Sequence, residues 1–159
     1  IGMIEIRGPN VFQGYWNMPE KTAAELRENG FFITGDLGKI DAQGYVHIVG
    51  RSKDLIISGG YNIFPKEIEQ ILDDVPGVLE SAVIGVPHAD FGETVLAVVV
   101  LRSGVTLQES DLAAEVAQKL ARFKNPKFYQ IIAELPRNTM GKVQKNLLRD
   151  MYKGFFAAQ

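Results

Sequence analysis

The sequence changes character at Arg51, and this division limits what the chain can fold into. A proline-led helix is predicted from Pro19 to Leu26. Three segments before Arg51 are typical of short strands: residues 3–7, 31–34 and 45–49. A strip of this size is too small to bury a core of its own. The chain also begins in mid-strand without an initiator Met, so we expect residues 1–51 to be the end of a larger N-terminal domain.

After Arg51 the pattern is that of a compact α+β domain. We expect a small mixed α/β unit over residues 55–159, with helices packed on a short antiparallel sheet. Ser110 is the expected N-cap of the second helix. The predicted strands cover residues 55–57, 61–64, 79–86, 94–101 and 126–132, and the predicted helices cover residues 65–75, 110–121 and 145–156.

Composition excludes several classes of function. The chain of 159 residues is 46% hydrophobic and 23% charged, with a net charge of -2, so we expect no basic surface for nucleic acid. The absence of cysteine excludes disulfides, thiolate metal sites and a catalytic cysteine. The apolar run at residues 95–101 is too short to span a bilayer, and no signal peptide precedes it. His47 and His88 are isolated, so no metal site is expected. The absence of cysteine is compatible with a reducing compartment, and we expect a cytoplasmic protein.

The segment PRNTMGKVQK, residues 136–145, is the strongest chemical signal. Lys142 follows a glycine, which lets the backbone approach a ligand closely. Its ammonium is a compact charge on a flexible stem and suits phosphate. The segment lies on a loop before the last helix, which favours a cation delivered to an anionic reaction centre built elsewhere.

Two polar positions near the division have competing interpretations. Asp36 follows the strand at residues 31–34, where it could accept hydrogen bonds from a ribose diol or satisfy backbone N–H groups in an Asx-turn. Arg51 could bind phosphate or ribose oxygens as a fork. The charged linker at residues 50–54 is either a hinge or a solvated segment with a surface ion pair contributing about 0–1 kcal/mol.

Ser58, Gly59 and Gly60 lack the spacing of a phosphate-binding P-loop. Two glycines between strands indicate a tight hairpin turn. In the functional alternative, the backbone of these glycines, which carries no side chains, lines the path of a narrow ligand.

Three motifs in order carry a family resemblance: FFITGD, GYVHIVGRSKDLIISGGYNIFPKEIE and LPRNTMGK. Together they resemble the C-terminal part of the adenylate-forming enzymes, which include acyl-CoA synthetases, peptide-synthetase adenylation domains and luciferases. The resemblance covers essentially the whole chain. It implies that residues 1–51 end a large adenylation domain, that residues 52–54 are a hinge, and that residues 55–159 are a mobile C-terminal domain.

The resemblance also implies roles for single residues. Asp36 is similar to the ribose-binding aspartate, and Arg51 to an arginine that contacts the nucleotide. Lys53 lies at the hinge position. Lys142 is similar to the lysine that bridges the substrate carboxylate and the α-phosphate.

The loop formed by Ser58, Gly59 and Gly60 is similar to the one that lines the pantetheine tunnel in the second half-reaction. Glu93, in GET, fits the family pattern without an evident physical role.

Within the family, SGGYNIFPKEIE is similar to acyl-CoA synthetases rather than to peptide-synthetase domains. The latter more often carry a basic residue after the glycine, and Tyr61 departs from that pattern. RNTMGKVQKN looks especially like malonyl-CoA synthetases. The implied substrates are a carboxylic acid, ATP with Mg²⁺ bound outside this segment, and CoA. The implied partners are the chain's own N-terminal domain and a lysine acetyltransferase acting on Lys142. A peptide-synthetase adenylation domain and a non-catalytic α+β interaction module remain open, and residues 1–159 alone are expected to be inactive.

Overall fold

The computed structural model describes residues 1–155. These residues form two compact units, one over Ile1–Lys53 and a second that begins at Asp54.

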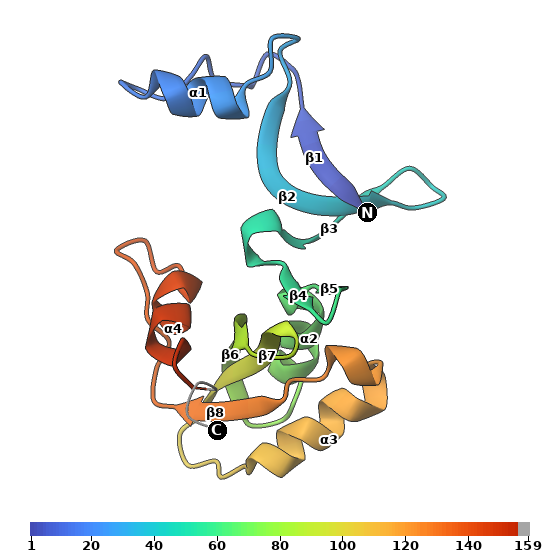
Figure 1. Cartoon of the computed structure of the whole chain (residues 1–159), viewed down its shortest axis with the longest axis vertical. Helices are drawn as coiled ribbons and strands as arrows, with labels where there is room; N and C mark the ends of the chain where they lie inside the picture. Colours follow the sequence, from blue (N-terminus) through green and yellow to red (C-terminus); the bar gives the residue numbers. More distant parts are fainter. Residues whose placement is uncertain (156–159) are drawn as a thin grey trace. The chain divides into compact units, whose positions relative to one another are not determined.

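The first unit is an antiparallel sheet in the order β1-β2-β3, with strands at Gly2–Ile6, Phe32–Ile40 and Val46–Arg51 (Figure 1). A short helix, α1 (Pro19–Glu25), begins at a proline, whose missing N–H group is not needed in a first helical turn. Neither of the hydrophobic core clusters contains a residue of this unit. Several of its large apolar side chains are exposed, and Trp16 is 89% exposed. The prediction that this strip is too small to bury a core is therefore confirmed.

Strand β2 is longer than predicted, and this changes the setting of Asp36. The sequence suggested that the strand ends at Thr34, because Gly35 and Asp36 resemble a turn. In the structure β2 continues to Ile40, and Asp36 pairs with Arg51 of β3. Gly35 adopts a φ of +76°, and the register shifts at Gly38, so the strand accommodates its turn-like residues by bending.

The second unit is built around β7 (Gly92–Leu101), which pairs with three other strands. Along one edge it is antiparallel to β6 (Val78–His88). Along the other edge it meets β4 (Ile56–Ser58) at Gly92 and runs parallel to β8 (Phe128–Ile132) from Leu96 to Val100. The hairpin partner of β4 is β5 (Tyr61–Ile63). The predicted α+β class with a mainly antiparallel sheet is confirmed, and the parallel β7–β8 pair is an addition that was not predicted.

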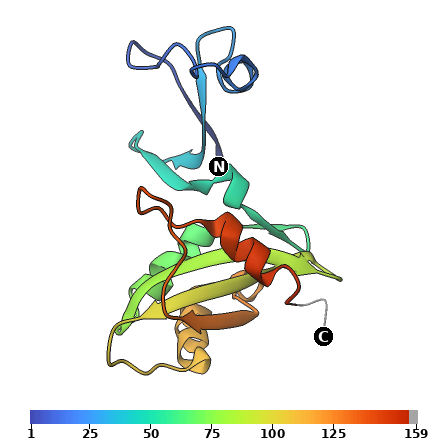
Figure 2. The same ribbon diagram turned by 90° about the vertical axis from the view of Figure 1, so that its left-hand side faces the viewer.

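Helices cover both faces of this sheet (Figure 2). Helices α2 (Pro65–Asp73) and α3 (Glu109–Lys119) bury Ile68, Leu72, Leu112 and Val116 in one core cluster, and α4 (Lys145–Tyr152) buries Leu148 in the other. Single turns of 3₁₀-helix occur at Ser52–Asp54 and Arg122–Lys124. Successive residues of β7 enter opposite clusters, Val95 and Ala97 on one side and Leu96 and Val98 on the other. This two-sided burial explains why β7 is continuously apolar instead of alternating.

Two helix boundaries differ from the predictions. Helix α3 begins at Glu109 with Gln108 as its N-cap, so the assignment of Ser110 was wrong. The carboxylate of Asp111 accepts the backbone N–H of Gln108 at 2.8 Å, which favours the earlier start. Helix α4 ends at Tyr152, whereas the prediction extended to Phe156, which lies outside the described residues.

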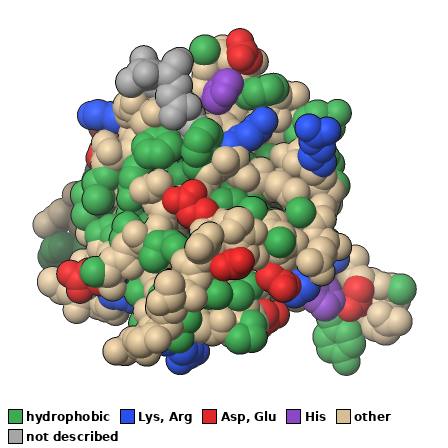
Figure 3. Space-filling view, turned by 90° about the horizontal axis from the view of Figure 1, so that it is seen from below, with side chains coloured by type: hydrophobic (Ala, Val, Ile, Leu, Met, Phe, Trp, Pro, Cys, Tyr) green, Lys and Arg blue, Asp and Glu red, His purple; other side chains and the backbone are tan. Residues whose placement is uncertain are grey.

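Acidic and basic side chains are interspersed with hydrophobic ones over the face displayed in Figure 3, and no continuous basic surface is visible on that face. None of the helices within residues 1–155 combines the length and the apolar character that crossing a bilayer requires.

Replacing Leu148 by alanine should test the α4 side of the core. Leu148 is fully buried, whereas its neighbour Leu147 is 40% exposed. We expect Leu148→Ala to lower the free energy of unfolding by about 2–5 kcal/mol and Leu147→Ala to change it by less than about 0.5 kcal/mol. Urea unfolding should be followed by far-UV circular dichroism, because the single tryptophan, Trp16, lies in the first unit. Equal losses for the two variants would contradict the assignment of Leu148 to the core.

Candidate functional site

The first unit brings Asp36 and Arg51 into contact. They are partners in the register of β2 and β3, and Arg51 Nε lies 2.7 Å from Asp36 Oδ1. The hydroxyl of Thr34 accepts the N–H of Asp36 at 3.1 Å and donates to the carbonyl oxygen of Ile4 at 2.8 Å. The Asp36 carboxylate therefore takes part in an ion pair, and not in the Asx-turn that the sequence left open.

These groups line a cavity of about 610 Å³ within the first unit. Thr34, Asp36, Arg51 and Lys53 contribute polar groups of both charges, and β1, β2 and α1 supply the remaining walls. On the α1 side, the phenol of Tyr15 donates a hydrogen bond to Glu25, which raises the pKa of Tyr15. A carboxylate beside a guanidinium can accept from hydroxyls while the guanidinium donates to anionic oxygens, so the cavity has the chemistry to hold a ribose phosphate.

Lys53 is the last residue of the first unit. It lies in the middle of the single 3₁₀ turn Ser52–Asp54, and its side chain is exposed. Its neighbour Asp54 belongs to the second unit and forms an ion pair with Arg149 of α4 at 2.5 Å. The hinge role of Lys53 stays a prediction.

In the second unit, Lys142 lies on a hydrogen-bonded turn between β8 and α4. The side-chain oxygen of Asn138 accepts the N–H groups of Met140 and Lys142 at 3.0 and 2.9 Å. Gly141 adopts a φ of +75°, which favours glycine. The Lys142 side chain is exposed, and its ammonium has no ion pair within residues 1–155. The turn therefore presents a cation that is free to bind an anion.

Arg137 supports this turn from its base. Its guanidinium donates to the carbonyl oxygen of Gly141 at 2.6 Å and forms an ion pair with Glu80 of β6. Arg137 also forms an isolated bridge with Val143 across the turn. The arginine and the asparagine of the PRNTMGK motif thus hold the backbone around Lys142.

Ser58, Gly59 and Gly60 form the turn of the β4–β5 hairpin, as the two glycines predicted. Gly59 and Gly60 have φ values of +55° and +82°. The N–H of Gly59 donates to the carbonyl oxygen of Phe91 at 3.0 Å, whereas a Cβ on Gly60 would meet no atom within 4 Å. The Gly60 backbone therefore faces open space.

Beside this turn is a pocket of about 430 Å³ that was not predicted from the sequence. It combines aromatic rings, with Tyr61 and Phe123 stacked at 4.7 Å, and the cations Arg122 and Lys127. The buried side-chain oxygen of Asn125, another lining residue, has no hydrogen-bond partner. Rings and cations together can hold a base and its phosphates. The aromatic residue between two basic ones in ARFKNPK was the available sequence signal.

Glu93 gains a physical role from the structure. Its Oε2 accepts the N–H of Ile57 at 2.9 Å, and β4 pairs with β7 only through Ser58 and Gly92. Gly85 makes room for this carboxylate, because a Cβ there would lie 2.8 Å from Glu93 Oε1. Glu93 therefore fixes the strand that leads into the Ser58–Gly60 turn.

No group of three or more histidine, aspartate or glutamate side chains within residues 1–155 could hold a metal ion. The described residues thus offer no cluster of carboxylates that would by itself hold Mg²⁺.

Residues 67–142 match the family model of the AMP-binding enzyme C-terminal domain. Among solved structures, the chain is similar to ATP-bound MatB from Rhodopseudomonas palustris, with a TM-score of 0.90 and 62% identity over 98% of this chain and 31% of that one. Among curated proteins, it is 48% identical to the 3-[(3aS,4S,7aS)-7a-methyl-1,5-dioxo-octahydro-1H-inden-4-yl]propanoyl:CoA ligase of Rhodococcus jostii (strain RHA1), over 96% of this chain and 30% of the relative. It is 45% identical to a long-chain-fatty-acid–CoA ligase of Bacillus subtilis (strain 168), over 92% of this chain and 26% of the relative.

The chain thus spans less than a third of the length of these relatives. Within that span the sequence identities are high, and the match to MatB extends over both units. The chain therefore belongs to the adenylate-forming enzymes, in the branch of the AMP-forming acyl-CoA synthetases, and carries their AMP-binding C-terminal domain.

Proposed function

We propose that this chain is the C-terminal part of an AMP-forming acid–CoA ligase and that it supplies the lysine for one half-reaction and the CoA-binding loop for the other. The observation that carries the proposal is the exposed ammonium of Lys142, held on an ordered turn without an ion pair among the described residues. The alternatives of a carrier-protein acceptor and of a non-catalytic module have less support, since the relatives named above are CoA ligases.

In the first half-reaction a carboxylate oxygen attacks the α-phosphate of ATP, forming acyl-AMP and releasing pyrophosphate. Both reactants are anions, so much of the barrier is electrostatic. The Lys142 ammonium, placed between the carboxylate and the α-phosphate, stabilises the charge that develops there. A preorganised donor in such a position contributes about 3–4 kcal/mol to transition-state stabilisation.

Asp36 and Arg51 are proposed to hold the nucleotide during this step. Their contact at 2.7 Å uses Oδ1 of Asp36, so Oδ2 is proposed to accept from the ribose hydroxyls, while Arg51 keeps further N–H groups for oxygens of the nucleotide. Mg²⁺ is proposed to bind with ATP through ligands outside this chain.

In the second half-reaction the sulfur of CoA attacks the acyl carbonyl carbon, the bond to AMP breaks, and the thiol proton is released. The thiol needs the place that Lys142 occupied, so the second unit is proposed to rotate about Lys53 between the steps. The Ser58–Gly60 turn then lines the path of the pantetheine arm. The aromatic and cationic pocket beside it suits the nucleotide end of CoA.

The acid is proposed to be malonate. The support for malonate is the segment RNTMGKVQKN, which looks like that of malonyl-CoA synthetases. The pocket that selects the acid is proposed to lie in an N-terminal domain, which is also the partner of the mobile second unit. The proposed location is the cytoplasm, where ATP and CoA are both available.

Replacing Lys142 by alanine should separate the half-reactions. In the full-length protein that carries this chain, we expect Lys142→Ala to slow malonate-dependent pyrophosphate exchange by about 10²–10³-fold. Thioester formation from supplied malonyl-AMP should continue, because the ammonium has no role in that step. Lys153→Ala removes another exposed lysine of the second unit and should leave both rates unchanged. Equal loss of both half-reactions in Lys142→Ala would refute the assignment.

Replacing Gly60 by leucine should have the opposite selectivity. The side chain would project into the proposed pantetheine path, so thioester formation should fall more than pyrophosphate exchange. Gly104→Leu is the matched control, because Gly104 has a similar φ of +76° and equally open space around its Cβ position. A larger effect of Gly60→Leu on pyrophosphate exchange, or equal effects of the two variants, would show that the turn does not guide CoA.

Lys142 is also proposed to be a site of regulatory acetylation, which would remove its charge. Its exposed side chain on a projecting turn is accessible to a lysine acetyltransferase. After acetyltransferase treatment, we expect mass spectrometry to find acetyl-Lys142 and pyrophosphate exchange to fall in proportion, while thioester formation from malonyl-AMP persists. Unmodified Lys142 after a treatment that acetylates a control substrate would argue against this proposal.

A further inference from the structure

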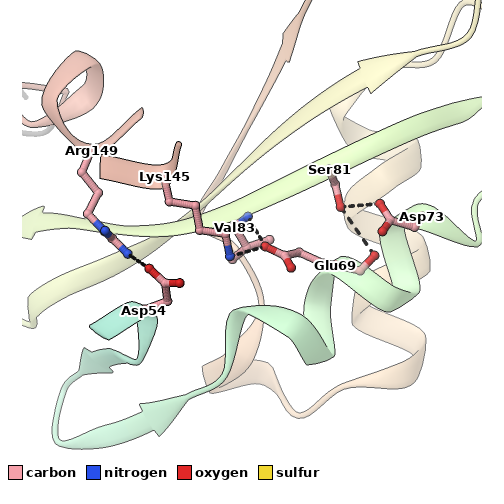
Figure 4. A network of polar contacts seen from close by, with 7 residues as sticks. All are labelled: Asp54, Glu69, Asp73, Ser81, Val83, Lys145 and Arg149. Carbon is pink, nitrogen blue, oxygen red and sulfur yellow. Dashed lines mark hydrogen bonds and ion pairs between the residues drawn. The ribbon is translucent and has the colours of Figure 1, made fainter. Parts of the chain in front are cut away.

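A buried carboxylate joins three elements of the second unit. Glu69 of α2 is only 6% exposed. Its Oε1 accepts the backbone N–H of Val83 at 2.9 Å and the ammonium of Lys145 at 2.5 Å (Figure 4). Val83 lies on β6, the strand at the end of the sheet order, so Glu69 satisfies an N–H group that no further strand can pair.

The ion pair connects the two faces of the sheet. Helix α2 contributes Leu72 to one core cluster, and α4 contributes Leu148 to the other. Lys145, the first residue of α4, reaches Glu69 past the edge strand with a side chain that is 18% exposed. A well-packed pair of charges at this depth fixes the start of α4 relative to α2 and β6.

The start of α4, at Lys145, directly follows the Lys142 turn. Gln144, directly before Lys145, donates its N–H to the carbonyl oxygen of Pro136 at 2.8 Å and closes the turn. The other side of the base is held by the ion pair of Arg137 with Glu80, which is also on β6. Both sides of the turn are therefore attached to the same strand.

Further along the same helix, α4 is attached to the start of the second unit. Arg149 pairs with Asp54, the residue that follows the proposed hinge at Lys53 (Figure 4). Helix α4 is thus fixed at its first residue and again one helical turn later. A rotation that begins at the hinge would carry the Lys142 turn with it as one body.

We propose that Glu69 and Lys145 are positioning residues for the adenylation step. Their ion pair holds the backbone beneath Lys142 so that its ammonium reaches the α-phosphate in one geometry. The proposal rests on the proposed function, because it needs Lys142 to act in adenylation. Neither residue is proposed to touch a substrate. Both act through the position of Lys142, and a shift of about 1 Å at the reacting groups can cost about 10²-fold in rate.

The test uses the full-length protein and measures the two half-reactions separately. Glu69→Gln keeps an oxygen for Val83 but removes the charge that Lys145 needs. We expect it to lower kcat for pyrophosphate exchange by about 10²-fold, with little change in the KM values for ATP and acid. Thioester formation from supplied acyl-AMP should persist. Lys145→Arg keeps the charge, so its kcat for pyrophosphate exchange should be the closest to wild type among these variants.

Glu67→Gln is the matched control on the same helix. Glu67 also forms an ion pair at 2.7 Å, but its partner Lys124 belongs to the 3₁₀ turn Arg122–Lys124 and not to α4 or the Lys142 turn. It should leave pyrophosphate exchange unchanged. All rates are normalised to the folded fraction, measured by circular dichroism.

A second variant keeps the proposal testable if Glu69→Gln fails to fold. Combining Glu69→Gln with Lys145→Met leaves no unpaired charge in the interior, so the fold should survive. Pyrophosphate exchange should still be slow, because the connection to α4 is missing. Restoration of the wild-type rate in this double variant would overturn the proposal, since the loss would then come from an uncompensated charge.

Two other results would also overturn it: equal losses in both half-reactions of the folded variants, or normal adenylation by Glu69→Gln while Lys142→Ala is inactive in that step. Normal adenylation by Lys142→Ala would instead defeat the proposed function, and the positioning role with it. The two failures are therefore distinguishable.

Discussion

The Glu69 carboxylate lies where α2, the edge of β6 and the start of α4 meet, and the geometry of the second unit depends on how this charge is satisfied. A buried carboxylate is unfavourable unless hydrogen bonds and an opposite charge compensate for its lost hydration. Here a backbone N–H and one ammonium supply both. Because those partners come from β6 and α4, the compensation is available only when the sheet and both helices are assembled.

The arrangement of the sheet explains why such a connection is needed. Strand β7 is apolar on both faces, so helices must cover both, and helices on opposite faces share no direct packing. Contact between them must pass around an edge of the sheet. Lys145 makes that contact at β6, and the Lys142 turn follows directly from the helix that it anchors.

The candidate chemistry is divided between the units in a way that fits a two-step reaction. The first unit contains a paired carboxylate and guanidinium in a polar cavity, and the second contains a free ammonium and a glycine turn beside an aromatic, cationic pocket. An ordered turn suits the proposed role of Lys142 better than a flexible tether would, because electrostatic stabilisation depends on a charge that is already in place. The groups of both units belong to one chain of the AMP-forming acyl-CoA synthetase family.

The sequence by itself determined the local features: the division near Arg51, the hairpin at Gly59 and Gly60, the apolar stripes of the helices, and the motif around Lys142. Periodicity and turn chemistry act between neighbouring residues, so a single sequence expresses them directly. Only the tertiary structure decided that Asp36 pairs with Arg51, that β8 is parallel to β7, that Glu93 holds Ile57, and that Glu69 meets Lys145. These contacts join segments far apart in the chain. They depend on strand order and on which helix covers which face, and no local pattern specifies either.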